Sequence, residues 1–230
     1  MQGLEVKSES GTFQINSQTR VTAFLRKGTV TTSLKQIDSG EWVKTYAQVL
    51  ANLSTEILAF SSEYKCNILS SNGGIVEIGC ESEVPVQVSY WVFGKGVTTS
   101  NQGVQVFDGN GENFENLLYD SSWIPIKPLS IISAGVTNAG IGSFAVVPMN
   151  VQSLIRRQSI TNASGRTDHL YTRTDQAVSI SPTNQIEASN RVIEEYRLTE
   201  LSSTNPVGTT EYTAENNTPT KYILIDVSGL

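Results

Sequence analysis

An approximate internal repeat is the feature of this 230-residue chain that most constrains its fold. The segment GLEVKSESGTFQINS begins at Gly3, and the segment GVQVFDGNGENFENLLYDSS begins at Gly103, at an offset of one hundred residues. Each segment has a short alternating run, a glycine-containing turn and a returning run, which is the pattern of a β-hairpin. A repeat of this length predicts an architecture that is built twice.

The ends of the two copies are also alike. Pro85 precedes VQVSYWVFG and Pro219 precedes TKYILIDVSG, and both runs have the composition of strands that begin just after a proline. Between start and end, each copy has an apolar run followed by a hairpin pattern: EILAFSS with CNILSSNGGIVEIGC, and GSFAVVPM with AVSISPTNQIEASNRVIEEYRL. We therefore predict an all-β fold of two tandem antiparallel β-sandwich-like modules. Module one covers residues 1–95, a linker covers 96–102, and the related module two covers 103–230.

The composition agrees with an all-β fold and excludes several classes of function. Charged residues make up 17% of the chain, and the net charge of −6 disfavours general nucleic-acid binding, which requires a basic face. No apolar run approaches the roughly 20 residues that cross a bilayer, so we expect no membrane insertion. The opening MQGLEVKSES lacks a signal-peptide pattern, so we expect synthesis in a cytoplasm.

One segment departs from the strand pattern. From Trp42 to Ile57 the apolar residues recur at helical spacing, and Asp38 and Ser39 precede them as candidate N-caps. We predict at most one short helix in the chain, at this place. A loop followed by a strand is the alternative, because short apolar runs are ambiguous.

The two cysteines, Cys66 and Cys80, flank SSNGG, which is typical of a hairpin turn. A three-residue loop at 72–74 would place them directly opposite each other on neighbouring strands. We expect two small buried thiols, given the expected cytoplasmic synthesis, and a cross-strand disulfide is the alternative. Their spacing is not that of a zinc site, which usually has four Cys or His ligands.

Module two contains a stretch at 152–175 that has no counterpart in module one, and we predict an inserted basic loop there. The candidate interface residues of this stretch are Arg156, Arg157, Arg166, His169, Tyr171 and Arg173. Long loops on a β scaffold commonly carry function, and arginine and tyrosine are frequent interface anchors. A solvated loop or a contact between subunits is the simpler interpretation. Tyr90 is a further interface candidate, because it alternates with Trp91 and Phe93, which we expect to share a core-facing side of their strand.

No motif in the sequence predicts catalysis. His169, the only histidine, is adjacent to Asp168, and adjacent residues rarely form the orienting pair of a Ser-His-Asp triad. The segment DGNGEN at 108–113 has oxygen ligands at alternate positions but lacks the sixth-position glycine of a calcium loop, so we interpret it as a turn. No phosphate-binding or dinucleotide motif occurs. We predict no enzyme activity, no metal and no cofactor.

Short motifs at the start and end of the chain resemble those of a known class of proteins. The opening pattern G-L-x-V-x-x-x-x-G-x-x-x-x-x-S, at Gly3, Leu4, Val6, Gly11 and Ser17, resembles the N-termini of small tailed-bacteriophage virion proteins. In many of these proteins the N-terminal motif is G-L-x-V-F-x-x-x-G-x-x-x-F-D-S. The second copy is closer to it, with Gly103, Val106, Phe107, Gly111, Tyr119, Asp120 and Ser121. The closing IDVSG, from Ile225 to Gly229, is also similar to the end of such proteins.

The resemblance implies a structural protein of a phage tail tip, fibre base, or neck or collar. Such a protein would be made in the host cytoplasm, would be located in the virion, and would form a homo-oligomer that docks to other virion proteins. The first alternative is a receptor-binding or carbohydrate-binding protein at the tail end, with a host surface receptor as its partner. A small hydrolase is a further alternative.

Overall fold

The computed structural model describes residues 3–8, 11–16, 21–36, 42–96, 103–107, 117–149, 153–163, 166–201, 208–215 and 220–230. Every regular element in these ranges is a β-strand, so the all-β prediction is confirmed. In chain order the strands are β1 (Gly3–Ser8), β2 (Gly11–Asn16), β3 (Thr22–Thr31), β4 (Ser33–Gln36), β5 (Trp42–Leu50), β6 (Ile57–Ser61), β7 (Cys66–Asn72), β8 (Ile75–Cys80), β9 (Gln87–Lys95), β10 (Gln105–Phe107), β11 (Leu117–Asp120), β12 (Pro128–Ile132), β13 (Gly135–Asn138), β14 (Phe144–Pro148), β15 (Ser153–Thr161), β16 (Arg166–Ile180), β17 (Gln185–Leu201), β18 (Gly208–Glu215) and β19 (Tyr222–Asp226).

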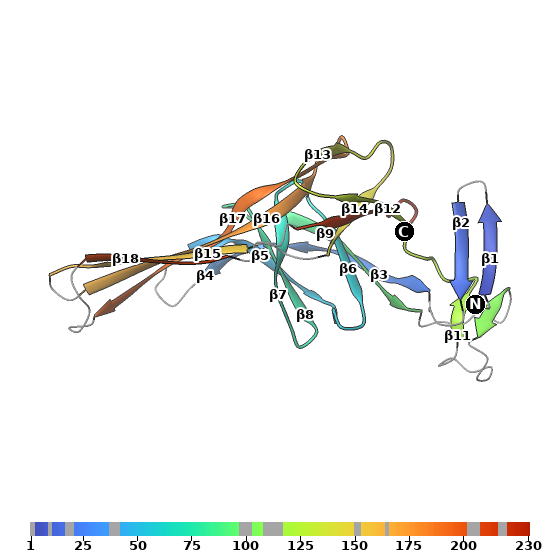
Figure 1. Cartoon of the computed structure of the whole chain (residues 1–230), viewed down its shortest axis with the longest axis horizontal. Coiled ribbons are helices and arrows are strands. Elements are labelled where there is room, and N and C mark those ends of the chain that lie inside the picture. The colour runs from blue at the N-terminus through green and yellow to red at the C-terminus, as the bar shows by residue number, and fades with distance from the viewer. Residues whose placement is uncertain are drawn as a thin grey trace.

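Two antiparallel sheets form the layers of a sandwich (Figure 1). One sheet has six strands in the order β12-β19-β14-β6-β9-β3. The other has nine strands, with β13-β17-β16-β7-β8-β5-β4 in order, β15 paired with β16, and β18 paired with β15. The main hydrophobic core contains buried side chains from both sheets, including Phe60 and Tyr222 from the first and Val76 and Ile78 from the second. The sandwich-like class is therefore confirmed.

Both sheets are continuous across the boundary that was predicted at 96–102. In the six-stranded sheet, β6 pairs with β14 through Phe60 and Val146, and in the nine-stranded sheet, β7 pairs with β16 through Cys66 and Val178. We call this place, where β6 meets β14 and β7 meets β16, the junction. Since strands from before and after the boundary share one core, the two halves form a single continuous sandwich rather than two separate ones.

The strand order repeats on the two sides of the junction. From the junction outward, the six-stranded sheet has β6, β9 and β3 on one side and β14, β19 and β12 on the other. The nine-stranded sheet has β7, β8 and β5 on one side and β16, β17 and β13 on the other. The segments that resemble each other in sequence therefore occupy equivalent places about the junction. The strands without such a counterpart are β4, β15 and β18.

The predicted helix between Trp42 and Ile57 is wrong, because this segment forms β5, a turn and the start of β6. Thr45, Ala47 and Val49 alternate into the core and are at most 5% exposed, whereas Leu50 is 71% exposed. The apolar residues that recur at helical spacing therefore do not share one buried face. The segment follows the period of two that places alternate residues of a strand on one side.

The two copies of the opening motif both form two-stranded antiparallel hairpins, β1 with β2 and β10 with β11. In the second hairpin, Asp120 is fully buried and accepts hydrogen bonds of 2.8 Å from the Ser122 backbone N–H and from Gln105 Nε2. Gly103 has a φ of 109°, and a Cβ atom there would lie 2.0 Å from Ser121 Oγ, so the position requires glycine. These residues of the motif thus have a local structural role.

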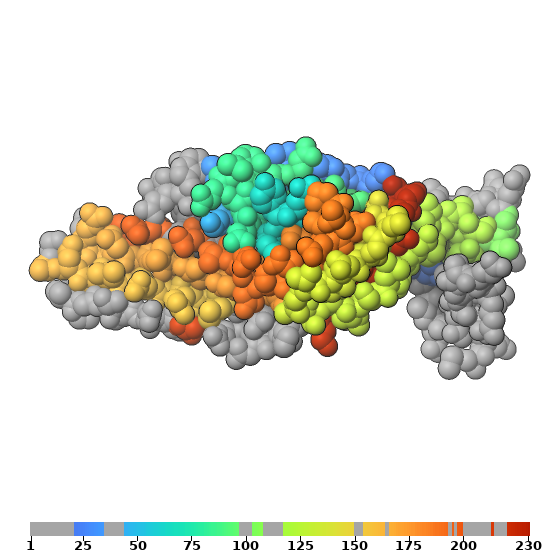
Figure 2. All heavy atoms as spheres, turned by 90° about the horizontal axis from the view of Figure 1, so that it is seen from above, coloured from blue at the N-terminus to red at the C-terminus, as the bar shows by residue number. Residues whose placement is uncertain are grey.

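The prediction of an inserted loop at 152–175 is wrong, because this stretch forms β15 and the first part of β16. β15 pairs with β18 on one side and with β16 on the other, and β17 pairs with β16 along its length. We call β15, β18 and residues 166–175 of β16 and 190–201 of β17 the arm. The arm extends as one sheet beyond the six-stranded layer, at the end of the molecule opposite β1 and β2 (Figure 1). Figure 2 shows β15 and β16 at the opposite end from β11.

Candidate functional site

The arm carries six of the seven predicted interface residues, and strand alternation divides them between its two faces. One face, which we call the inner face, carries Arg157, His169, Tyr171 and Arg173. Arg157 pairs directly with Tyr171, and the other two lie two positions before and two positions after Tyr171 on β16, so they point to the same side. Arg156 and Arg166 lie on the opposite, outer face and are exposed. His169 is only 3% exposed, so the predicted residues do not form one solvated basic surface.

Hydrogen bonds between buried polar side chains hold the inner face together. Ser159 Oγ lies 2.7 Å from His169 Nδ1, and Arg157 Nη2 lies 3.0 Å from the same nitrogen. An arginine can only donate, so His169 Nδ1 is an acceptor in this contact. The hydroxyls of Thr161 and Thr167 lie 2.9 Å apart in the next pair along the strands. The serine, the histidine and both threonines are at most 7% exposed, so these contacts form a closed polar layer.

Two arginines of the inner face contact other parts of the protein. The Arg157 guanidinium lies 5.4 Å from the centre of the Tyr171 ring, which is within the range of a cation–π contact. Arg173 Nε donates to Asp175 Oδ1 at 2.9 Å, and Asp175 is fully buried. Arg173 Nη1 donates to the backbone carbonyl of Leu69 in β7, also at 2.9 Å. Arg173 therefore connects the base of the arm to the sandwich.

The outer face of the arm offers charged and apolar side chains to solvent. Asp168 accepts hydrogen bonds from Thr199 Oγ1 at 2.6 Å and from Arg166 Nε at 3.4 Å. The Thr199 hydrogen bond, with the nearby Arg166 charge, holds the pKa of Asp168 below its usual value. Ile160 is 52% exposed on the same face. Because Asp168 and His169 lie on opposite faces of β16, this carboxylate is not placed to orient the imidazole.

Tyr90, the seventh predicted interface residue, lies in the sandwich and not on the arm. It is half-buried and packs against the main core. Trp91 and Phe93 share the opposite side of β9, as predicted, but the expectation that this side faces the main core is wrong, because both belong to a second apolar cluster on the outer surface of the six-stranded sheet. Tyr90 thus contributes to packing between the sheets, which is a role that its position in the sequence did not predict.

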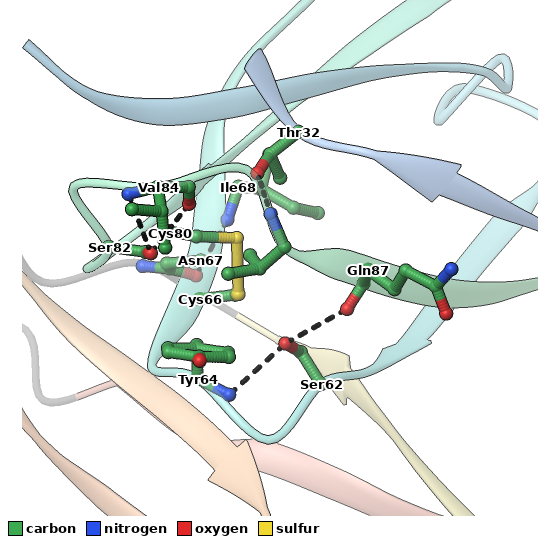
Figure 3. The surroundings of a disulfide bond; sticks show 11 residues. Thr32, Ser62, Tyr64, Cys66, Asn67, Ile68, Cys80, Ser82, Val84 and Gln87 are labelled. Atoms are coloured by element: carbon green, nitrogen blue, oxygen red, sulfur yellow. Dashed lines mark hydrogen bonds between the residues drawn. A yellow bond between two sulfur atoms is a disulfide. The ribbon is translucent and has the colours of Figure 1, made fainter. Parts of the chain in front are cut away.

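The two cysteines form a disulfide between β7 and β8, so the expectation of free thiols is wrong (Figure 3). Their predicted position directly opposite each other is confirmed, with Cα atoms 4.2 Å apart. The predicted three-residue loop is wrong, because Gly73 and Gly74, both with positive φ, form a two-residue turn. A bulge at Leu69 shifts the register by one residue and brings the cysteines opposite each other.

A groove of about 390 Å³ opens at one end of the junction. Its lining includes Ser61, Gln87, Ser89 and Trp91 from the six-stranded sheet, and Asn184 from the turn between β16 and β17. Sequence reasoning missed this site, since only Trp91 had been considered and it was assigned to the core. The available signal was the alternation of small polar residues with apolar ones along β9, which indicates a strand face that is not fully buried.

The described part of the chain has neither a membrane-spanning helix nor a metal-ligand cluster. None of its residues belongs to a helix able to cross a membrane. Within the same residues, no three His, Cys, Asp or Glu side chains gather as a metal site requires. The predicted turn at 108–113 lies outside the described residues.

Comparison with known proteins gives no relative from which a role could be transferred. No protein-family model, no curated protein and no solved structure matches this chain significantly.

Proposed function

We propose that this protein is a structural component of a tailed-phage virion and that it acts by self-assembly and by docking to other virion proteins. The tail tip, the fibre base and the neck or collar are the positions that the motif resemblance implies. The observation that carries the proposal is the arm, a sheet that continues beyond the layer that covers the rest of the sandwich (Figure 1).

In a sheet without a second layer, any apolar side chains on the two faces need to be covered, and the backbone groups of the two edge strands need hydrogen-bond partners. Buried polar side chains, including His169 and Ser159, occupy part of the inner face of the arm, and Ile155 on the same face is 43% exposed. The outer face exposes Ile160 together with Arg156 and Arg166, which is the mixture of apolar and arginine side chains that is common at interfaces. The outer face of the arm is therefore suited to contact with a partner.

The edge of the arm supports the same role. Among the described strands, β18 pairs with β15 alone, so its other edge has no described partner. A strand from a neighbouring copy or from another virion protein can add to such an edge through backbone hydrogen bonds. One contact of this kind, repeated around an axis, produces a closed ring or spike.

Light scattering on the full chain at two widely separated concentrations tests self-assembly. We expect a closed oligomer whose mass is the same at both concentrations. Ile160→Lys places a charge on the outer face of the arm and should reduce the oligomer to smaller species. Leu50→Lys is the matched control, because Leu50 is an exposed apolar residue of β5 in the sandwich, and this variant should keep the wild-type mass. A wild-type monomer at both concentrations, or equal masses for the two variants, would contradict the proposal.

The virion assignment has its own test, which is mass spectrometry of purified phage particles from a host that carries the gene. We expect peptides of this chain to sediment with the particles in a fixed ratio to the major capsid protein. Peptides that remain entirely in the soluble fraction of the lysate would refute the virion assignment without bearing on self-assembly.

A further inference from the structure

We propose that the groove at the junction binds a neutral saccharide. Its volume of about 390 Å³ lies in the range of roughly 300–1,000 Å³ that is typical of small-molecule sites. Strands β6 and β9 supply its floor, and the segment before β14 and the turn between β16 and β17 supply its walls. The groove is separate from the arm, so this inference does not depend on the proposed assembly role.

The floor of the groove presents polar groups that are free to bind a ligand. The side chains of Gln87, Ser89 and Trp91 lie on the same side of β9, because the three positions are two residues apart. Ser61 of β6 is the direct cross-strand partner of Ser89. Within the described part of the chain, the side chains of Gln87, Ser89 and Ser61 form no hydrogen bond. Two hydroxyls and one amide are therefore available as donors and acceptors, as recognition of sugar hydroxyls requires.

Trp91 adds an apolar surface beside these polar groups. Its side chain is half-buried and lines the groove, but its Nε1 atom is buried and has no hydrogen-bond partner among the described residues. Since the nitrogen is inaccessible, the part of the indole that the groove exposes is carbon. A pyranose ring has an apolar C–H face and a hydroxyl edge, which match an aromatic carbon surface with adjacent hydroxyl and amide groups.

The wall formed by residues 140–143 is held in place before any ligand binds. Asn184 has a φ of 58°, and its Nδ2 donates to the carbonyls of Gly140 and Gly142 at 2.9 and 3.0 Å. The Ser143 backbone N–H donates to Ser228 Oγ at 2.8 Å. A loop that is already ordered loses less conformational entropy on binding, so this wall favours a preformed site. The positive φ of Asn184 is one that asparagine readily adopts in a turn, and the Asn184 backbone N–H donates to the Ser181 carbonyl at 2.9 Å within that turn.

The charge of the groove selects against other ligand classes. Glu63 is the one charged residue that lines it among the described residues, and no lysine or arginine does. A phosphate, a sulfate or an acidic sugar would meet this carboxylate without a compensating cation. An extended peptide would need an open strand edge for its backbone, whereas the floor of the groove is the face of paired strands. A neutral saccharide is the class that these features accommodate.

Saturation-transfer NMR and titration calorimetry on the full chain test this inference, with the methyl glycosides of glucose, galactose, mannose and N-acetylglucosamine as probes. We expect at least one glycoside to bind, with the strongest transfer to the C–H protons of one ring face. Gln87→Ala and Ser89→Ala should each weaken its binding roughly fivefold, because each removes one hydrogen-bonding group. The oligomer mass of both variants should equal that of the wild type, which separates this site from the assembly role.

Thr31→Ala is the matched control. Thr31 is exposed, pairs directly with Gln87 on the same face of the six-stranded sheet, and does not line the groove. This variant should bind the glycoside as the wild type does. Absence of transfer to all four glycosides would overturn the inference. So would equal weakening by Thr31→Ala, or tighter binding of inorganic phosphate than of any glycoside.

Discussion

The phenol ring of Tyr90 lies against the backbone of Gly28, its directly paired residue on the neighbouring strand β3. A Cβ atom at position 28 would lie 2.7 Å from Cζ of Tyr90 and 2.6 Å from its hydroxyl oxygen. The ring therefore occupies the space that any other side chain at position 28 would need, and it covers the backbone that the glycine leaves open. This contact explains why Tyr90 packs as it does and is not a freely exposed interface residue.

Gly28→Ala should destabilise the fold by about 1–3 kcal/mol, because the added methyl group would displace the Tyr90 ring from its packed position. Urea denaturation measures this loss. The same substitution in a Tyr90→Ala background should cost much less, because the clash is absent there, and the difference is the coupling energy of the pair. Additive costs in the two backgrounds would mean that Gly28 matters for another reason.

The disulfide predicts a large effect of replacing both cysteines. Cys66 and Cys80 are fully buried and are separated by 14 positions in the sequence. A link that closes a loop of this size stabilises a fold by about 3 kcal/mol, mainly by restricting the unfolded chain. Cys66→Ala with Cys80→Ala should lower the free energy of unfolding by about that amount. A reductant should destabilise the wild type and leave the double variant unchanged, and an identical response of the two proteins would argue against the disulfide.

Arg173 should matter more for stability than the other exposed or half-buried arginines of the arm. Arg173→Met removes the donor to the buried Asp175 carboxylate and the donor to the Leu69 carbonyl, so we expect a loss of about 3 kcal/mol. Arg166→Met is the control, because the Arg166–Asp168 pair is exposed and worth at most about 1 kcal/mol.

Hydrogen exchange locates the effect of the Arg173 substitution. Amides of residues 153–161 should exchange faster in Arg173→Met than in the wild type, because the base of the arm loses its contact with β7. Amides of β5 should keep their protection, since β5 lies on the other side of β8 in the sheet. A uniform rise across both regions would show that Arg173 stabilises the whole fold and not the attachment of the arm.

The ion pair between Arg26 and Glu56 predicts a pH-dependent part of the stability. Arg26 Nη1 donates to Glu56 Oε1 at 2.9 Å, and the Asn52 backbone N–H donates to Glu56 Oε2 at 2.8 Å. The Arg26 hydrogen bond, followed by that of Asn52, lowers the pKa of Glu56 below its ordinary value. A carboxyl whose pKa is lower in the folded state stabilises the fold above its unfolded pKa, and this contribution is lost as the pH falls through the folded pKa.

Glu56→Gln tests this sign. Between roughly pH 5 and pH 3, the wild type should lose more of its free energy of unfolding than the variant, because only the wild type has a carboxylate to protonate at this position. Urea denaturation at several pH values measures both curves. Parallel curves for the two proteins would show that the ion pair contributes nothing to acid sensitivity.

The sequence predicted those features that depend on local periodicity. The runs that became β6, β9, β14 and β19 were identified as strands, the opening motifs as hairpins, and the cysteines as cross-strand neighbours. Alternation and turn residues contain this information, because the side-chain period of a strand is two and a hairpin needs residues that adopt positive φ. The segment from Trp42 to Ile57 was wrongly predicted as a helix, because its apolar residues also fit a helical spacing, although they do not share one buried face.

Tertiary structure alone decided how these strands combine. The pairing of Phe60 with Val146 and of Cys66 with Val178 joins segments that are far apart in the chain, and no local pattern specifies such a partner. The arm was not predicted for a related reason. The buried side chains of its inner face include hydrogen-bonded polar ones, so β15 and β16 lack there the apolar alternation that marks a buried strand. The groove exists only because two sheets and two turns meet at the junction. Local sequence thus determined which residues form strands, and long-range packing determined which edges meet and what the surfaces can bind.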